Sequence, residues 1–95
     1  MKITVTQPAV KWFEQEWGFQ TGDFIRIFVR YGGHSTVHEA YSLGVTREAP
    51  NEMAISTTER GITFYMEQDD IWYMSEKDLT IDVQPGTDEI SFHLS

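Results

Sequence analysis

The feature that most constrains the fold is a repeated two-residue alternation of apolar and polar side chains. It is clearest in DFIRIFVRY (Asp23–Tyr31), where isoleucine, valine and tyrosine fall on one face and phenylalanine and arginine on the other. A period of two is that of a β-strand with one buried face. LTIDV (79–83) and ISFHL (90–94) alternate in the same way. We therefore expect a half-buried strand at each of these three places.

Other segments also have strand character. They are residues 2–5, 40–46, 52–58 and 61–67, and a short apolar segment at 71–74 follows a turn at 68–70. Glu59-Arg60-Gly61 is typical of a hairpin connection, in which the glycine can take a positive φ. About seven or eight short strands are therefore predicted.

A single amphipathic helix is predicted near the N-terminus. Thr6 is suited to the N-cap, Pro8 is tolerated in the first turn, and Gly18 suits the position after the last turn. The apolar residues between them, which include two tryptophans, fall at helical spacing. One helix and many short strands predict a mainly β (β-rich α+β) domain over residues 1–95, either a sandwich or an irregular barrel.

The composition excludes several classes of site. The chain has 95 residues, thirteen aromatic side chains and no cysteine. Disulfides, thiolate zinc sites, cysteine nucleophiles and cysteine-ligated iron–sulfur clusters are therefore impossible. The N-terminus lacks the apolar run of a signal peptide and no stretch has the length of a membrane span, so we expect a cytoplasmic protein without a membrane partner.

The net charge of −8 is unevenly distributed. Residues 67–95 contain eight acidic side chains and one basic side chain, Lys77. Such a surface repels phosphate backbones, so we expect no nucleic-acid partner. A solvated acidic face is one interpretation, and a basic protein partner or a cation is the other.

A candidate metal site lies in YGGHSTVH (31–38) and the residue that follows it. His34 and His38 could face one divalent iron or zinc ion, with Glu39 adding a carboxylate oxygen. The alternative is a glycine turn with surface histidines. Ser35 beside His34 lacks a predicted orienting acid and oxyanion hole, so no catalytic residue is assigned.

Two further pairs of residues are candidates for anion or partner contact. Arg26 and Arg30 share one strand face and could bind a carboxylate or another anion, or pair with the acidic C-terminal third. Trp72 and Tyr73 could line a groove for a ligand or partner, although most aromatic residues simply fill cores.

The order of segments resembles the HesB-like family, the A-type iron–sulfur carrier and scaffold domains. A strand that ends in RYGG leads to Gly32-Gly33-His34-Ser35-Thr36, where the family has Gly-Gly-Cys-Ser-Gly. Gly61–Phe64 and Leu79–Asp82 resemble two further family regions. The similarity spans nearly the whole chain and is greatest to the cysteine-free, YneR-like branch.

This resemblance implies a β-rich pseudobarrel with the N-terminal helix packed against it, but it does not carry over the activity. The family's three cysteine ligands are absent, and His34 stands in the position of the first. We expect a non-catalytic binding or adaptor protein with a protein partner and no cofactor. The alternatives are weak binding of iron or zinc through His34 and His38, and an enzyme of unknown reaction. The sequence does not predict the oligomeric state.

Overall fold

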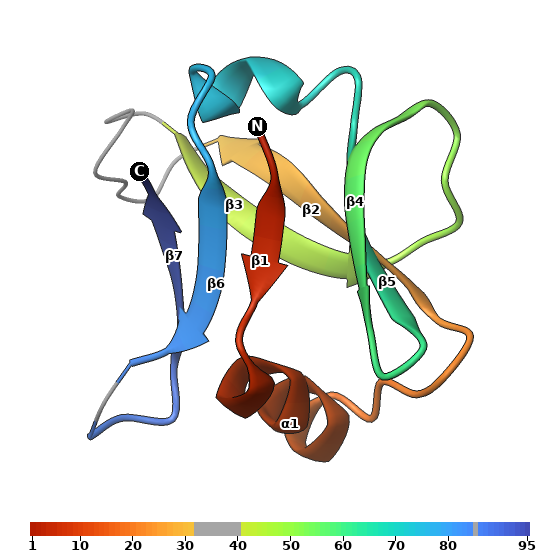
Figure 1. Ribbon diagram of the computed structural model, residues 1–95, viewed down its shortest axis with the longest axis vertical. Helices are drawn as coiled ribbons and strands as arrows, with labels where there is room; N and C mark the ends of the chain where they lie inside the picture. Colours follow the sequence, from red (N-terminus) through yellow and green to blue (C-terminus); the bar gives the residue numbers. More distant parts are fainter. Residues whose placement is uncertain (32–40, 85) are drawn as a thin grey trace.

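The computed structural model describes residues 1–31, 41–84 and 86–95 (Figure 1). Its elements are β1 (Ile3–Val5), α1 (Gln7–Glu16), β2 (Phe24–Tyr31), β3 (Tyr41–Arg47), β4 (Met53–Glu59), β5 (Ile62–Glu67), the 3-10 helix η1 (Ile71–Met74), β6 (Leu79–Val83) and β7 (Ile90–Leu94). The prediction of a mainly β fold with one helix near the N-terminus is therefore confirmed.

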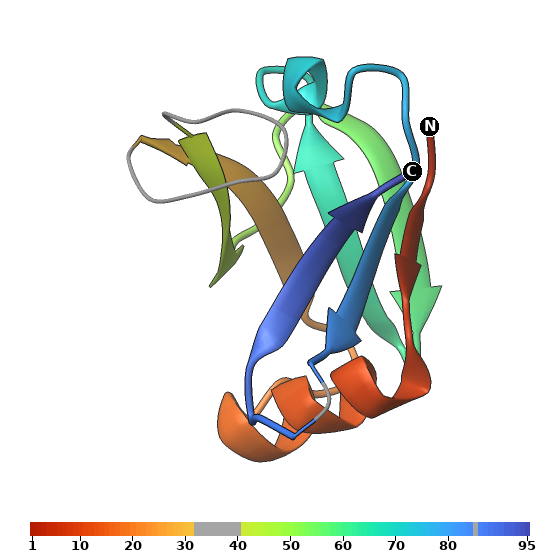
Figure 2. The ribbon, with the colours of Figure 1, turned by 90° about the vertical axis from the view of Figure 1, so that its left-hand side faces the viewer.

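The strands form two sheets that share one apolar core. The smaller sheet has the order β1-β6-β7, with β1 and β6 parallel and β6 and β7 antiparallel. The larger sheet has the order β3-β2-β5-β4, in which only β2 and β5 are parallel. Helix α1 lies across one end of the two sheets and η1 lies at the other end (Figures 1 and 2).

The alternation in β2 gives the expected two faces. Ile25 and Ile27 are fully buried, whereas Arg26 and Phe28 on the opposite face are half-buried. Strand β5 is buried along nearly its whole length because it lies between β2 and β4. A two-residue turn, Arg60-Gly61, joins β4 to β5. Both residues have positive φ, as the two-residue turns of hairpins require.

Helix α1 begins and ends where the sequence predicts. The Thr6 hydroxyl accepts a hydrogen bond from the Ala9 N–H at 3.3 Å, and Pro8 lies in the first turn. Gly18 follows the last turn with φ of 69°. The buried face includes Phe13. In the part of the chain that the structure describes, no helix is long and apolar enough to cross a membrane.

The segment 71–74 is a 3-10 helix, so the described chain has seven strands rather than eight. Tyr73 and Met74 are both buried although they are adjacent in sequence. Successive side chains of a strand point to opposite faces, so a strand with one buried face could not bury both. Ser75 ends the helix in the left-handed region with φ of 50°.

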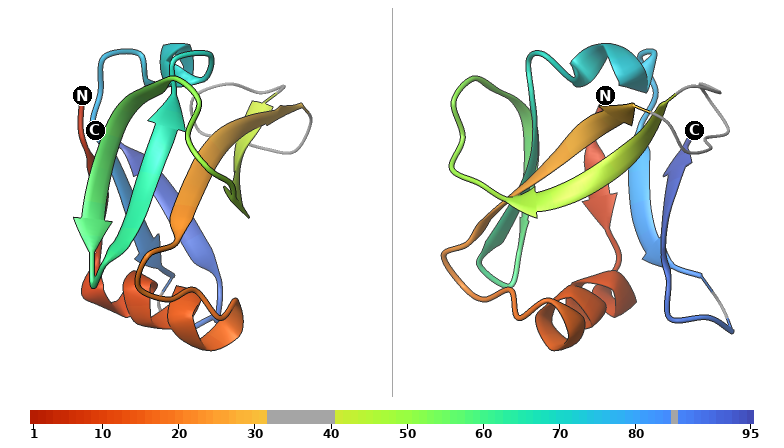
Figure 3. Two further views of the ribbon diagram at one scale, coloured as in Figure 1. Left: turned by 90° about the vertical axis from the view of Figure 1, so that its right-hand side faces the viewer. Right: turned by 180° about the vertical axis from the view of Figure 1, so that it is seen from behind.

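The two sides of the molecule differ in how the sheets meet. On one side the edge strands β1 and β4 lie against each other (Figures 1 and 3). On the other side the edge strands are β3 and β7. Helix α1 lies below both of these strands in Figure 2.

Candidate protein-binding groove

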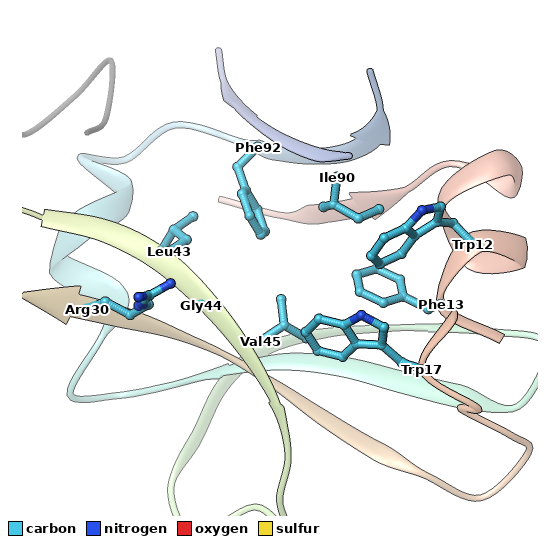
Figure 4. Close-up of a pocket in the computed structure, with 9 residues that line it drawn as sticks. All are labelled: Trp12, Phe13, Trp17, Arg30, Leu43, Gly44, Val45, Ile90 and Phe92. Carbon is cyan, nitrogen blue, oxygen red and sulfur yellow. The ribbon is translucent and has the colours of Figure 1, made fainter. Parts of the chain in front are cut away.

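An apolar groove with a volume of about 190 Å³ lies between β3 and β7 (Figure 4). Its lining residues come from α1, β2, β3 and β7, and they are Trp12, Phe13, Trp17, Arg30, Leu43, Gly44, Val45, Ile90 and Phe92. An apolar cavity of about 150 Å³ is large enough to bind benzene. The groove can therefore accept a large apolar side chain.

Aromatic side chains of α1 close one end of the groove. The ring centroid of Phe13 lies 5.3 Å from that of Trp12 and 5.6 Å from that of Trp17. Phe13 is buried, whereas the side chain of Trp17 remains 45% exposed. Phe19 stacks on Phe13 at 5.4 Å and occupies the core beside it. An exposed tryptophan beside an apolar groove is typical of a protein-binding surface.

The backbone of β3 presents free hydrogen-bonding groups to this groove. The Glu48 N–H donates to the Phe24 carbonyl at 3.0 Å, and hydrogen-bonded pairs alternate along antiparallel strands. Gly44 therefore bonds to β2, while the N–H and C=O groups of Leu43 and Val45 point away from it. Among the described residues these outward groups have no backbone partner.

Strand β7 has the same arrangement on the opposite wall. Asp78 and Ser95 exchange two hydrogen bonds of 3.0 Å, which fixes the alternation between β6 and β7. The backbone groups of Ile90 and Phe92 then point away from β6. Four residues therefore line the groove with apolar side chains and also have backbone groups that point away from the neighbouring strand. They are Leu43, Val45, Ile90 and Phe92.

Arg30 reaches the groove because Gly44 has no side chain. A Cβ atom at Gly44 would lie 2.6 Å from Cδ of Arg30 and 2.7 Å from the ring of Phe28. The Arg30 side chain therefore lies over the backbone of β3, and Figure 4 shows it beside Gly44 at the end of the groove opposite Trp12. An interior glycine in a strand commonly marks such a close approach.

Arg30 is also the arginine that lacks an ion pair within the described residues. The other three are paired: Arg26 with Glu48 and Asp70, Arg47 with Asp23, and Arg60 with Glu14. The exposed guanidinium of Arg30 is thus an available cation at the rim of an apolar groove, in a chain of net charge −8.

Arg26 has a structural role instead. Its Nη2 atom lies 2.7 Å from Oδ2 of the buried Asp70, and its Nη1 atom lies 3.0 Å from Oε2 of Glu48. Asp70 also accepts the Val29 N–H at 3.3 Å. The hydrogen bond to Asp70 is the largest cause that raises the pKa of Arg26, with Glu48 adding to it and burial opposing it. This arginine therefore ties η1 to β2.

The remaining predicted contact residues lie apart from the groove. Tyr73 is buried in the core with 3% of its surface exposed. Trp72 is 49% exposed, and its ring meets Tyr41 edge-on at a centroid distance of 5.3 Å. Both belong to η1, at the end of the molecule opposite α1 (Figure 1). Of the four predicted contact residues, the structure brings only Arg30 to the groove.

The predicted metal ligands His34, His38 and Glu39 lie outside the described residues, so the iron or zinc site stays a prediction. Within residues 1–31, 41–84 and 86–95, no group of three or more metal-ligating side chains could hold an ion. A thiolate-held iron–sulfur cluster does not fit this chain, because the sequence contains no cysteine.

A serine–histidine contact on the outer face of the smaller sheet lacks the features of a catalytic pair. Nε2 of the exposed His93 lies 3.1 Å from the Ser91 hydroxyl. That hydroxyl is also 3.3 Å from the Asp82 carbonyl, to which it donates. The Asp82 carboxylate accepts from the Thr6 hydroxyl at 2.7 Å and the Val83 N–H at 2.8 Å. These hydrogen bonds lower the pKa of Asp82, and the bond from Thr6 is the largest cause. The carboxylate is therefore bound to Thr6 and Val83 and does not orient His93.

The sequence does not predict that residues 12, 17, 90 and 92 meet in one groove. The helical spacing of Trp12 and Trp17 predicts an apolar helix face, and the alternation of Ile90 and Phe92 predicts a buried strand face. One available signal is the density of four aromatic residues between positions 12 and 19. Of these rings, Phe13 and Phe19 are buried, whereas Trp17 remains 45% exposed.

Comparisons with known proteins give one family and several relatives. The sequence matches the profile of the family described as "Iron-sulphur cluster biosynthesis" over residues 1–95. It is 39% identical over 92 residues to a protein of Bacillus subtilis (strain 168) named "Pyruvate dehydrogenase inhibitor", with 97% of each chain covered. It is 33% identical over 95 residues to an uncharacterized protein of Staphylococcus saprophyticus, again with 97% of each chain covered.

Proposed function

Since the chain belongs to the HesB-like iron–sulphur cluster biosynthesis family, we propose that it is a non-catalytic binding protein of this family that attaches to a pyruvate dehydrogenase and lowers its activity. The target comes from the Bacillus subtilis relative, which is named "Pyruvate dehydrogenase inhibitor". The similarity to that protein extends over 97% of both chains. Inhibition by binding requires a surface rather than a catalytic centre.

The observation that carries the proposal is the groove between two strand edges whose outward backbone groups have no backbone partner among the described residues. Unpaired N–H and C=O groups on an edge strand are a template for an added strand from another chain. Here the edges of β3 and β7 border the same apolar groove, and Trp17 stands beside it. An incoming segment would gain main-chain hydrogen bonds from an edge and bury apolar side chains in the groove.

The absence of cysteine supports binding over cluster transfer. Transfer of an iron–sulfur cluster needs soft ligands, and imidazole or carboxylate groups alone do not supply the usual thiolate set. The Ser91–His93 contact offers no activated nucleophile, because the nearby carboxylate of Asp82 is already hydrogen-bonded to Thr6 and Val83.

The test measures pyruvate-dependent NADH formation by the pyruvate dehydrogenase complex of the organism from which the chain comes, while the purified chain is titrated in. We expect inhibition that saturates, together with co-elution of the chain and the complex. If the chain neither inhibits nor co-elutes with the complex, the proposed function is wrong.

Two exposed tryptophans provide a matched pair of variants for this assay. Trp17 borders the groove and is 45% exposed, whereas Trp72 lies in η1 and is 49% exposed. Trp17→Ala should weaken inhibition about tenfold or more, because truncating a tryptophan that is an interface hot spot costs about 2 kcal/mol or more. Trp72→Ala should leave inhibition unchanged. Equal effects of the two variants would contradict the assignment to the groove.

A further inference from the structure

We propose that the groove selects an extended apolar segment of a different protein that carries an acidic side chain, and that Arg30 binds this carboxylate. The inference rests on the proposed function in that it takes the chain to be a binding protein. It adds the chemistry of the bound segment, and it names Arg30 as the residue that recognises the acidic side chain of this segment.

The first support is the electrostatic contrast between Arg30 and the rest of the chain. The net charge is −8, and three of the four arginines are paired with carboxylates in the described structure. Arg30 has no such pair among the described residues, and its side chain lines the groove. A guanidinium recognises a carboxylate through two parallel N–H···O bonds, which adds orientation as well as attraction.

The second support is the close approach of Arg30 to Gly44. Gly44 is buried in the interior of β3, where glycine is normally unfavourable. A Cβ atom at this position would lie 2.6 Å from Cδ and 3.0 Å from Cγ of Arg30, so the Arg30 side chain can pass over β3 only because residue 44 is a glycine. Any larger residue would push the stem of Arg30 off β3. Gly44 is therefore a positioning residue for the guanidinium.

The geometry of an added strand defines the segment further. Leu43 and Val45 face the groove from one side of β3, whereas Arg30 lies on the other side and reaches the end of the groove across Gly44. Successive side chains of a strand point to opposite faces. The bound segment should therefore carry a large apolar residue and, at an adjacent position, an aspartate or glutamate.

A second copy of the chain is a poor occupant. Two copies that each carry a net charge of −8 repel one another. Asp88 and Glu89 directly precede Ile90, which lines the groove, so each copy would bring two further carboxylates to this face. The groove is accordingly assigned to a different protein whose acidic residue is placed against Arg30.

The experiment uses synthetic peptides of about eight residues, a common strand length. A panel of strand-forming sequences carries a phenylalanine and, at the adjacent position, either glutamate or glutamine. Binding is followed by tryptophan fluorescence in a Trp72→Phe background, so that emission comes from Trp12 and Trp17, which line the groove. The glutamate peptides should bind about fivefold more tightly than their glutamine partners, the upper range for an exposed ion pair.

Three variants separate the role of Arg30 from a general charge effect. Arg30→Gln should abolish the preference for glutamate, and Gly44→Ala should reduce it without changing the net charge. Arg60→Gln removes the same charge from the β4–β5 hairpin and should retain the preference. Circular dichroism and urea unfolding of each variant confirm that it folds; a misfolded Gly44→Ala chain leaves Arg30→Gln as the deciding variant.

The inference is overturned if glutamate and glutamine peptides bind Arg30-containing protein equally, if no peptide of the panel binds, or if the chain dimerises through the groove. Its failure is distinct from that of the proposed function. Suppose that the parent protein inhibits pyruvate dehydrogenase but binds glutamate and glutamine peptides equally, and that Arg30→Gln inhibits as strongly as the parent. This result would remove only the role of Arg30. Peptide selection through Arg30 without any effect on pyruvate dehydrogenase would remove only the named target.

Discussion

The two sides of this sandwich use their edge strands differently. On one side β1 and β4 lie against each other, and a register shift between Met53 and Ile55 further disrupts the edge of β4. On the other side β3 and β7 leave outward backbone groups beside an apolar groove. Proteins usually block free edges because they invite pairing with another chain. An edge next to apolar side chains that has no backbone partner within residues 1–31, 41–84 and 86–95 therefore indicates a binding surface.

The same contrast appears in two arginines on one face of β2. Arg26 is held by a buried aspartate and belongs to the packed structure, with only a quarter of its side chain exposed. Arg30, four residues further on, lies across Gly44 and lines the groove. Residue type and strand face are identical, so the difference comes from the partners that each position meets.

The largest effect should come from a matched pair of phenylalanine truncations. Phe64 is fully buried in β5, whereas Phe92 is half-buried in the wall of the groove. Phe64→Ala should lower the free energy of unfolding by about 3–5 kcal/mol, and Phe92→Ala by about 1–2 kcal/mol, because the groove residue already faces solvent. Urea unfolding measures both. Equal losses would show that the groove wall is as tightly packed as the core.

The next largest effect should come from breaking the ion pair between Arg26 and the buried Asp70. Asp70→Ala leaves the guanidinium of Arg26 and the N–H of Val29 without their partner, so the free energy of unfolding should fall by about 2–3 kcal/mol. Arg30→Gln, on the same strand face, should change it by less than about 0.5 kcal/mol. A large loss for Arg30→Gln in urea unfolding would place this arginine among the structural residues.

The smallest effect concerns the acid dependence of stability at Asp82, which links β6 to the N-cap of α1. Its folded-state pKa is lowered, so its contribution is present above the ordinary aspartate pKa of about 3.9 and is lost as the pH falls through the lowered value. Parent and Asp82→Asn should therefore differ in urea midpoint at pH 6, and the difference should shrink as the pH falls from about 4 through the lowered pKa. A difference that grows on acidification contradicts this sign.

Much of the fold could be predicted from local patterns. The cap at Thr6, the glycine after α1 and the alternation in β2 each act through neighbouring residues, so the sequence displays them directly. The segment 71–74 differs because its conformation depends on contacts made elsewhere. Asp70 is anchored to Arg26 and Val29, far away in sequence, and burial of both Tyr73 and Met74 follows from that anchor.

The groove could not be predicted in the same way. It joins α1, β3 and β7, which are separated by most of the chain, and its cation comes from β2. The sequence indicates that Arg30 and Arg26 share a face but not that only one of them is paired. The predicted metal residues His34, His38 and Glu39 lie outside the described structure and stay a prediction.

We claim that a partner docks on the β3 and β7 edges of the groove. Residue-resolved hydrogen exchange of the chain, alone and bound to pyruvate dehydrogenase, measures this docking at single amides. In the free chain the outward amides of Val45 and Phe92 should exchange fast, while those of Gly44 and Ser91, which bond to β2 and β6, exchange slowly. Binding should slow the exchange of the Val45 or Phe92 amide. Slowed exchange confined to β1 and β4, with β3 and β7 unchanged in the bound state, would contradict the claim.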